Sequence, residues 1–119
     1  MARPPITWLI TDTHFYHNKM VSEVGWPADY LQKIIGACAF YIASQDILFH
    51  LGDVIFYKYG ELNSILGRIP GRKILLRGNH DRKSNGWFMR NGFDFVADQI
   101  VLGDVIFSHK PLMSFPSGV

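Results

Sequence analysis

Side chains that bind metals or transfer protons follow four separate apolar segments of this sequence. In chain order they are Asp12 and His14, then Asp53, then Asn79 and His80, and finally His109. Carboxylate oxygen, amide oxygen and imidazole nitrogen together suit borderline divalent metals such as Mn²⁺, Fe²⁺ or Zn²⁺. Asp12 or Asp53 taken alone is more often a turn or helix-start carboxylate. Their common position after apolar segments is what favours a metal site.

The apolar segments that carry these residues have the length and composition of β-strands. Predicted strands cover residues 6–11, 46–51, 73–77 and 105–108, with a weaker strand over 93–97, and predicted helices cover 30–44, 60–68 and 85–90. This alternation is typical of an α/β layered fold. In open α/β sheets, ligands bind beyond the carboxyl ends of the strands, so we expect the four strand ends to converge on one site.

Local geometry around the predicted ligands supports the same reading. Gly52 and Gly78 precede two of them, and glycine lets the backbone turn tightly and approach a bound ion or phosphate. Asp12 and His14 are two residues apart on a segment that we expect to be extended, so their side chains would project to the same side. We therefore expect them to hold one metal together.

Composition indicates one compact globular domain over residues 1–119. Hydrophobic residues make up 48% of the chain and charged residues 18%, which argues against disorder. Cys38 is the single cysteine, so no intrachain disulfide can form. We find no signal-peptide pattern, and the most apolar window, residues 34–43, is too short to cross a bilayer. We therefore expect a soluble, cytoplasmic protein without a membrane partner.

The net charge of +2 is too small to indicate a nucleic-acid partner. Basic residues nevertheless gather around the third predicted ligand group: Arg72, Lys73, Arg77, Arg82 and Lys83. This cluster fits an anionic substrate and fits an ordinary solvated edge equally well. Nucleic-acid binding without catalysis rests on this cluster alone.

The ordered set of motifs resembles the calcineurin-like metallophosphoesterases, and most of all their small bacterial and phage members. The stretches that carry the resemblance are "TDTHFYHNKM", "FHLGDV", "ILLRGNHD" and "SHKPL". The resemblance covers nearly the whole chain. It implies a layered β-sandwich flanked by helices and the hydrolysis of a phosphomonoester or phosphodiester.

The resemblance also implies roles for the individual residues. Asp12 and His14 would bind a first divalent metal, Asn79 and His109 a second, and Asp53 would bridge the two. Mn²⁺ is the expected metal, with Fe²⁺, Zn²⁺ or Ni²⁺ as alternatives. A hydroxide shared by the two ions would attack the phosphorus. His80 would stabilise charge or protonate the leaving oxygen, and Asp81 would fix its loop by hydrogen bonds.

Two features depart from the family pattern. Family members carry a further Gly-His-x-His motif, which is absent from these 119 residues. We therefore expect the C-terminal part of the domain to be missing, each metal to lose a ligand, and open strand edges to favour a homo-oligomer. Many relatives also have an aspartate three residues after Asp53, where it orients the histidine corresponding to His80. This chain has Phe56 there.

These departures keep a second function open, namely a non-catalytic scaffold of the same fold that binds a partner protein. Two histidines to which the resemblance assigns no role also have simpler readings. His50 lies within a predicted strand and is expected to be structural. His17 precedes Asn18, a good N-cap residue, so a capping loop explains it as well as a substrate contact does.

Overall fold

The computed structural model describes residues 3–78 and 80–109. Its elements follow one another as β1 (Thr7–Ile10), α1 (Lys19–Ser22), α2 (Tyr30–Tyr41), β2 (Ile47–His50), the 3₁₀ turn η1 (Tyr59–Glu61), α3 (Leu62–Gly67), β3 (Arg72–Leu76), α4 (Asn85–Arg90), β4 (Phe95–Ala97), β5 (Gln99–Leu102) and β6 (Val105–Ser108). The α/β fold predicted from the sequence is confirmed. None of the helices that the structure describes has the length and apolarity that a bilayer-spanning segment needs.

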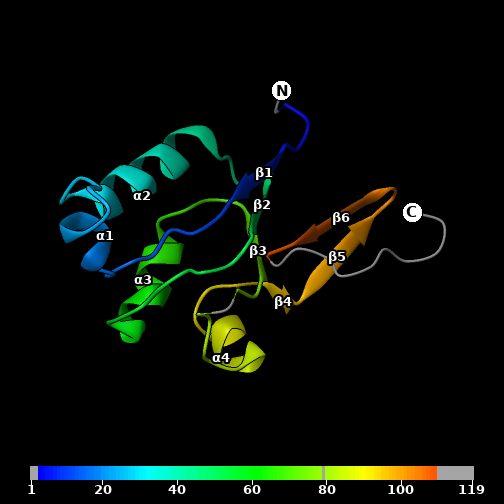
Figure 1. The fold of residues 1–119 in the computed structure, drawn as a ribbon. Helices are drawn as coiled ribbons and strands as arrows, with labels where there is room; N and C mark the ends of the chain where they lie inside the picture. Colours follow the sequence, from blue (N-terminus) through cyan, green and yellow to red (C-terminus); the bar gives the residue numbers. More distant parts are fainter. Residues whose placement is uncertain (1–2, 79, 110–119) are drawn as a thin grey trace.

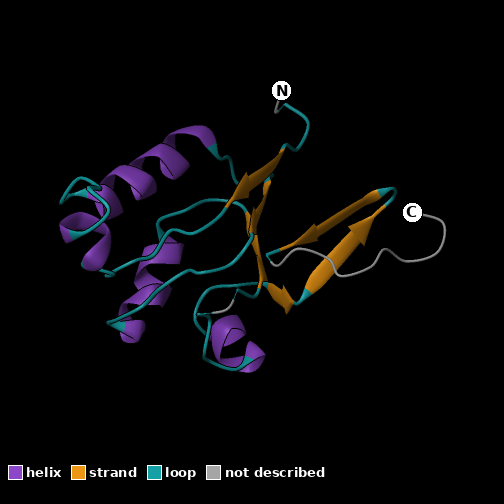
Figure 2. Cartoon of the chain, viewed as in Figure 1, coloured by secondary structure: helices purple, strands orange, loops and turns teal. Residues whose placement is uncertain are grey.

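Strands β1 to β4 form a parallel sheet in the order of the chain. The helices lie on one side of this sheet, and the antiparallel hairpin β5–β6 lies on the other (Figures 1 and 2). Phe107 of β6 stacks on Phe49 of β2, with ring centroids 5.2 Å apart. The hairpin is therefore a second β layer over the sheet. All four parallel strands end at the same edge, which places their following loops together.

The core lies between the sheet and the helices. The helix residues Leu62 and Phe88 and the β3 residue Leu75 are fully buried, and each contributes about 1.5–3 kcal/mol of hydrophobic stabilisation. Helix α2 buries a stripe of four residues, Tyr30, Leu31, Ile35 and Cys38. Its opposite side leaves Phe40 80% exposed. This exposed side of α2 could contact a second copy of the chain, but the homo-oligomer expected from the sequence stays a prediction. A monomeric mass by light scattering at micromolar concentration would contradict it.

Asp46 explains why α2 is shorter than predicted. The helix was expected to reach residue 44 but ends at Tyr41, because Ile42 turns to extended backbone. The backbone N–H of Ala43 then donates to the Asp46 carboxylate at 2.9 Å. Asp46 is fully buried and also accepts two hydrogen bonds of 2.7 Å from the Arg3 guanidinium. These bonds hold the pKa of Asp46 well below its usual range, so this carboxylate stabilises the amino end of the sheet.

Candidate metal centre

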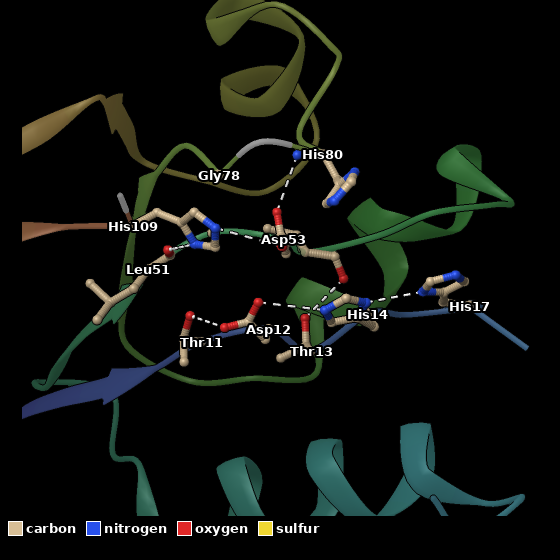
Figure 3. A network of polar contacts seen from close by, with 12 residues as sticks. Thr11, Asp12, Thr13, His14, His17, Leu51, Asp53, Gly78, His80 and His109 are labelled. Carbon is tan, nitrogen blue, oxygen red and sulfur yellow. Dashed lines mark hydrogen bonds and ion pairs between the residues drawn. The ribbon is translucent and has the colours of Figure 1, made fainter. Parts of the chain in front are cut away.

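The loops after β1 and β2 bring together Asp12, His14 and Asp53 (Figure 3). One ligand atom from each lies within 4.8 Å of the other two. The two loops are joined by backbone hydrogen bonds, from Asp12 N–H to Gly52 O at 2.9 Å and from His14 N–H to Asp53 O at 3.1 Å. Parallel pairing of β1 with β2 thus continues past the strand ends and sets the three side chains beside one another.

All three residues of this group have left-handed backbone conformations. The φ angles are 54° for Asp12, 47° for His14 and 58° for Asp53. A non-glycine residue in this region costs roughly 1–3 kcal/mol, and such residues cluster at functional sites. We expected Asp12 and His14 to lie on an extended segment, and that expectation is wrong. The backbone turns at both residues because each amide bonds to the neighbouring loop, and these turns bring the two side chains together.

His109, from the end of β6, faces the same carboxylate. Its Nε2 lies 3.6 Å from Asp53 Oδ2, and its Nδ1 lies 2.6 Å from Leu51 O. Because a carbonyl can only accept, Nδ1 carries a proton and donates it to Leu51 O, and Nε2 is the ring nitrogen that faces Asp53. A similar distance of 3.5 Å separates His14 Nε2 from Asp12 Oδ1. A cation between an imidazole nitrogen and a carboxylate satisfies both, so the donor set fits divalent metal.

Asp12 is held in the ionised form that a metal requires. Burial by itself would raise its pKa. The hydrogen bond from Thr11 and the interactions with Asp53, His109 and His14 outweigh burial, and the pKa of Asp12 is lowered. The Thr11 hydroxyl donates to Asp12 Oδ2 at 2.7 Å.

His17 has a role that neither of our two sequence readings foresaw. Its Nδ1 lies 3.0 Å from Nδ1 of His14, and its ring stacks on Phe56 with centroids 3.9 Å apart. The Tyr30 hydroxyl accepts a 3.0 Å bond from His17 N–H and donates to the His14 carbonyl. Burial first, then the charge of His14, lowers the pKa of His17 and keeps it neutral. His17 therefore positions the His14 ring, and the three-residue spacing of the two histidines was the available signal.

Phe56 lies among three imidazole rings. Besides His17 it stacks on His14, with centroids 4.7 Å apart, and it is tilted against His80 at 5.2 Å. His80 is exposed, and its backbone N–H donates to Asp53 Oδ1 at 3.2 Å. In place of a carboxylate that would hydrogen-bond His80, this chain thus has a ring that packs the site from one side. Trp26 adds an edge contact to His14 at 5.9 Å.

Asp81 fixes the loops as predicted. It is 3% exposed and accepts backbone hydrogen bonds from Gly78 at 2.6 Å, Asp53 at 2.9 Å and Val54 at 3.0 Å. Gly52 has a φ of 109°, and a Cβ there would lie 2.7 Å from the Gly78 nitrogen. The two glycines therefore let the two loops approach each other closely, a role that we had assigned to approach of an ion or phosphate.

His50 is structural, as predicted. Nδ1 accepts from Gly52 N–H at 3.0 Å, so Nε2 carries the proton and donates to Thr13 Oγ1 at 2.9 Å. The Thr13 hydroxyl in turn donates a hydrogen bond to Val54 O at 2.9 Å. Burial lowers the pKa of His50 to about 4. Neutral His50 thus holds the loop that carries Asp53 in place, through its hydrogen bonds with Gly52 and Thr13. Asn79, the remaining predicted ligand, lies outside the described residues.

The parallel sheet and the loops at its strand ends thus present a group of possible metal ligands at one end of the fold. Residues 7–117 match the family model described as calcineurin-like phosphoesterase, and the chain belongs to this family. Members of this family typically bind divalent metals, and Asp12, His14 and Asp53 form a group that could hold one.

Two further comparisons place the chain among relatives without assigned activities. An uncharacterized protein of Methanocaldococcus jannaschii is 27% identical over 97 residues, which are 75% of this chain and 55% of that protein. The crystal structure of a protein of unknown function from Aquifex aeolicus superposes with a TM-score of 0.71 at 30% identity. That match covers 88% of this chain and 60% of the other. The chain therefore spans little more than half the length of both.

Proposed function

We propose that this chain is a metal-dependent phosphoesterase that hydrolyses a phosphomonoester or a phosphodiester. The observation that carries the proposal is the group of Asp12, His14 and Asp53, three left-handed residues whose ligand atoms lie within 4.8 Å. Backbone strain of this kind is retained where the side chains have a function. Membership of the calcineurin-like phosphoesterase family supports the same class of reaction.

The proposed site would hold two divalent ions, with Mn²⁺ as the expected metal and Fe²⁺, Zn²⁺ or Ni²⁺ as alternatives. Asp12 and His14 would hold one ion, His109 and Asn79 the other, and Asp53 would contact both. The role of Asn79 rests on the family resemblance. Divalent ions in such a site lower the pKa of bound water and polarise a phosphoryl oxygen.

The remaining residues would orient the site and assist the leaving group. His80 donates its backbone N–H to Asp53 and leaves its imidazole exposed, where it would stabilise charge or donate a proton to the leaving oxygen. His17 Nδ1 would accept a hydrogen bond from Nδ1–H of His14. This bond would keep the proton of His14 on Nδ1 and leave Nε2 of His14 free to bind a metal. Asp81 keeps the loop of Asp53 in place through two of its backbone amides.

The test compares two aspartates that each follow a glycine. Asp53→Asn should lower Mn²⁺ content after desalting from about two ions per chain towards none, and lower hydrolysis of 4-nitrophenyl phosphate and bis(4-nitrophenyl) phosphate more than about 100-fold. Asp104→Asn, at the exposed turn between β5 and β6, is the matched control and should change neither value. An Asp53→Asn chain with full activity would refute the proposal.

A non-catalytic scaffold is the second candidate, and two observations favour it. Phe56 lies against His80, where the family resemblance implies an aspartate. Several large apolar side chains of the sheet and hairpin are also about half exposed: Leu9, Phe95, Val101, Leu102 and Val105. A wild-type chain that retains no Mn²⁺ and hydrolyses neither substrate would favour this candidate over the enzyme.

A further inference from the structure

A small pocket lies beside the candidate metal centre, on the side of His80. It has a volume of about 150 Å³, and its lining residues are Phe56, Tyr57, Tyr59, His80 and Arg82. His80 connects it to the site through its backbone hydrogen bond to Asp53 Oδ1. Phe56 connects it through the ring stack on His14. A group held in this pocket would therefore be attached to, or lie next to, whatever binds the metals.

The lining combines aromatic rings with cationic side chains. One face of Phe56 is stacked on the His17 ring, whose plane is only 7° from parallel. Tyr59 has the Lys83 ammonium 5.0 Å from its ring centroid. Arg82 adds a guanidinium, which stacks on planar rings and attracts their π electrons. This side of the site is thus built for ring–ring and ring–cation contacts.

Tyr57 is the lining residue whose ring is available to a ligand. It is 62% exposed, and among residues 3–78 and 80–109 it makes no hydrogen bond, ring contact or cation contact. It precedes Lys58, a non-glycine residue with a φ of 53°, at the start of η1. The turn therefore holds an exposed tyrosine at the rim of the pocket at a cost in backbone strain.

The size of the pocket limits what fits. A cavity of about 150 Å³ accommodates one small aromatic ring such as benzene. A larger fused ring would fit with one edge open to solvent. A flexible polar chain would gain little from three aromatic side chains, whereas a planar ring would stack on them.

We propose that the pocket of Phe56, Tyr57, Tyr59, His80 and Arg82 binds a planar aromatic ring on the esterified group of the substrate, as in a nucleotide. This inference rests on the proposed phosphoesterase function, since it names the substrate class of the same site. Tyr57 is the specificity-determining residue, because it offers its ring while the other rings already have partners.

The test measures binding without hydrolysis. The 119-residue chain in metal-free buffer is titrated with adenosine 5′-monophosphate and with ribose 5-phosphate, and the NMR signals of the backbone amides are followed. The nucleotide should bind roughly 5- to 150-fold more tightly and shift the signals of Tyr57, Tyr59 and His80. Equal affinities, or binding of neither compound at millimolar concentration, would overturn the proposal.

Two variants of Tyr57 test whether its ring, rather than the rest of the pocket, causes the preference for the nucleotide. Tyr57→Ala should remove most of the difference between the two compounds, and Tyr57→Phe should keep it. Tyr41→Ala removes an aromatic residue of α2 that is 59% exposed, against 62% for Tyr57, and should change nothing. If Tyr57→Ala still prefers the nucleotide as strongly as the wild type does, the subsite is wrong.

The two proposals fail in different ways. If the Mn²⁺-loaded chain hydrolyses no phosphoester but the metal-free chain still prefers the nucleotide, the aromatic pocket stands and the phosphoesterase function falls. If the loaded chain hydrolyses adenosine 5′-monophosphate and ribose 5-phosphate with equal kcat/KM and binds them equally, the function stands and the aromatic pocket falls.

Discussion

The same six residues, Leu-Gly-Asp-Val-Ile-Phe, occur at positions 51–56 and again at 102–107. In the first copy Asp53 is 6% exposed, left-handed and part of the candidate metal centre. In the second copy Asp104 is exposed at a two-residue hairpin turn, between the paired residues Leu102 and Val105. The same six residues therefore contribute to the candidate metal centre in one place and form a hairpin turn in the other.

The difference comes from what lies beside each copy. The first copy is preceded by His50, whose ring accepts a hydrogen bond from the Gly52 backbone N–H. The same copy pairs with the loop after β1 through a bridge between Ile55 and Phe15. The second copy folds back on β5 and pairs with its own neighbours. Neighbouring segments, rather than the six residues themselves, decide which aspartate is buried among ligands.

The Asp53→Asn and Asp104→Asn pair described above should give the largest difference between the two copies, in Mn²⁺ content and in hydrolysis.

The next largest difference is expected in unfolding free energy, between Gly52→Ala and Gly103→Ala. A Cβ at Gly52 would lie 2.6 Å from His109 Nδ1 and 2.7 Å from Gly78 N, so we expect a loss of about 4 kcal/mol in unfolding free energy. At Gly103 the φ of 60° alone costs about 1 kcal/mol. Urea unfolding measures both, and equal losses would contradict the comparison.

The residue before each copy gives a pH-dependent contrast, because His50 titrates and Val101 does not. Burial lowers the pKa of folded His50 to about 4, whereas the unfolded value is about 6.5. The folded state is therefore favoured above about pH 6.5 and loses about 3 kcal/mol as the pH falls towards 4. Urea unfolding between pH 7 and 4 should show this loss in the wild type and less of it in His50→Gln. An unchanged slope in the variant would assign the loss to other groups.

The valines of the two copies differ in burial. Val54 is 0% exposed and Val105 is 51% exposed. Val54→Ala removes two buried methyl groups and should cost about 2 kcal/mol, and Val105→Ala should cost less than about 0.5 kcal/mol. Thermal unfolding of the two variants measures the difference. A larger loss for Val105→Ala would mean that the hairpin is buried against another chain in solution.

The phenylalanines that end the two copies, Phe56 and Phe107, should give the smallest difference, in affinity for Mn²⁺. Phe56 stacks on His14 and His17, whereas Phe107 stacks on Phe49 of β2. Phe56→Leu removes the ring stack and should weaken Mn²⁺ binding about 2- to 10-fold, whereas Phe107→Leu should leave it unchanged. Calorimetric titration with Mn²⁺ tests this. Equal Mn²⁺ affinity in both variants would show that the stack does not position His14.

Much of this arrangement is predictable because it follows from apolar segments and what ends them. The parallel strands, the helix over 85–90 and the placement of ligands after strand ends all come from local patterns in the sequence. Asp81 and His50 were also assigned correctly, since an aspartate beside a glycine turn and a histidine within an apolar strand have few roles.

What could not be predicted depends on contacts between distant segments. The left-handed turns at Asp12 and His14 arise from bonds to the loop of Asp53, which lies some forty positions further along the chain. Strand β5 is the exception, because its pairing with β6 is local and Gly103 between two apolar runs was an available hairpin signal that we missed. The early end of α2 required knowledge of the partners of Asp46.

The edge contact of Trp26 with His14 gives the site a built-in optical reporter. The indole lies 5.9 Å from the imidazole that we propose to bind metal, so it should lose fluorescence when paramagnetic Mn²⁺ binds there. Trp8 donates its Nε1–H to Asp46 at the other end of the sheet and should emit unchanged. Occupancy of the site can therefore be followed in a cuvette, in real time and without any label, by comparing the wild type with a Trp26→Phe chain.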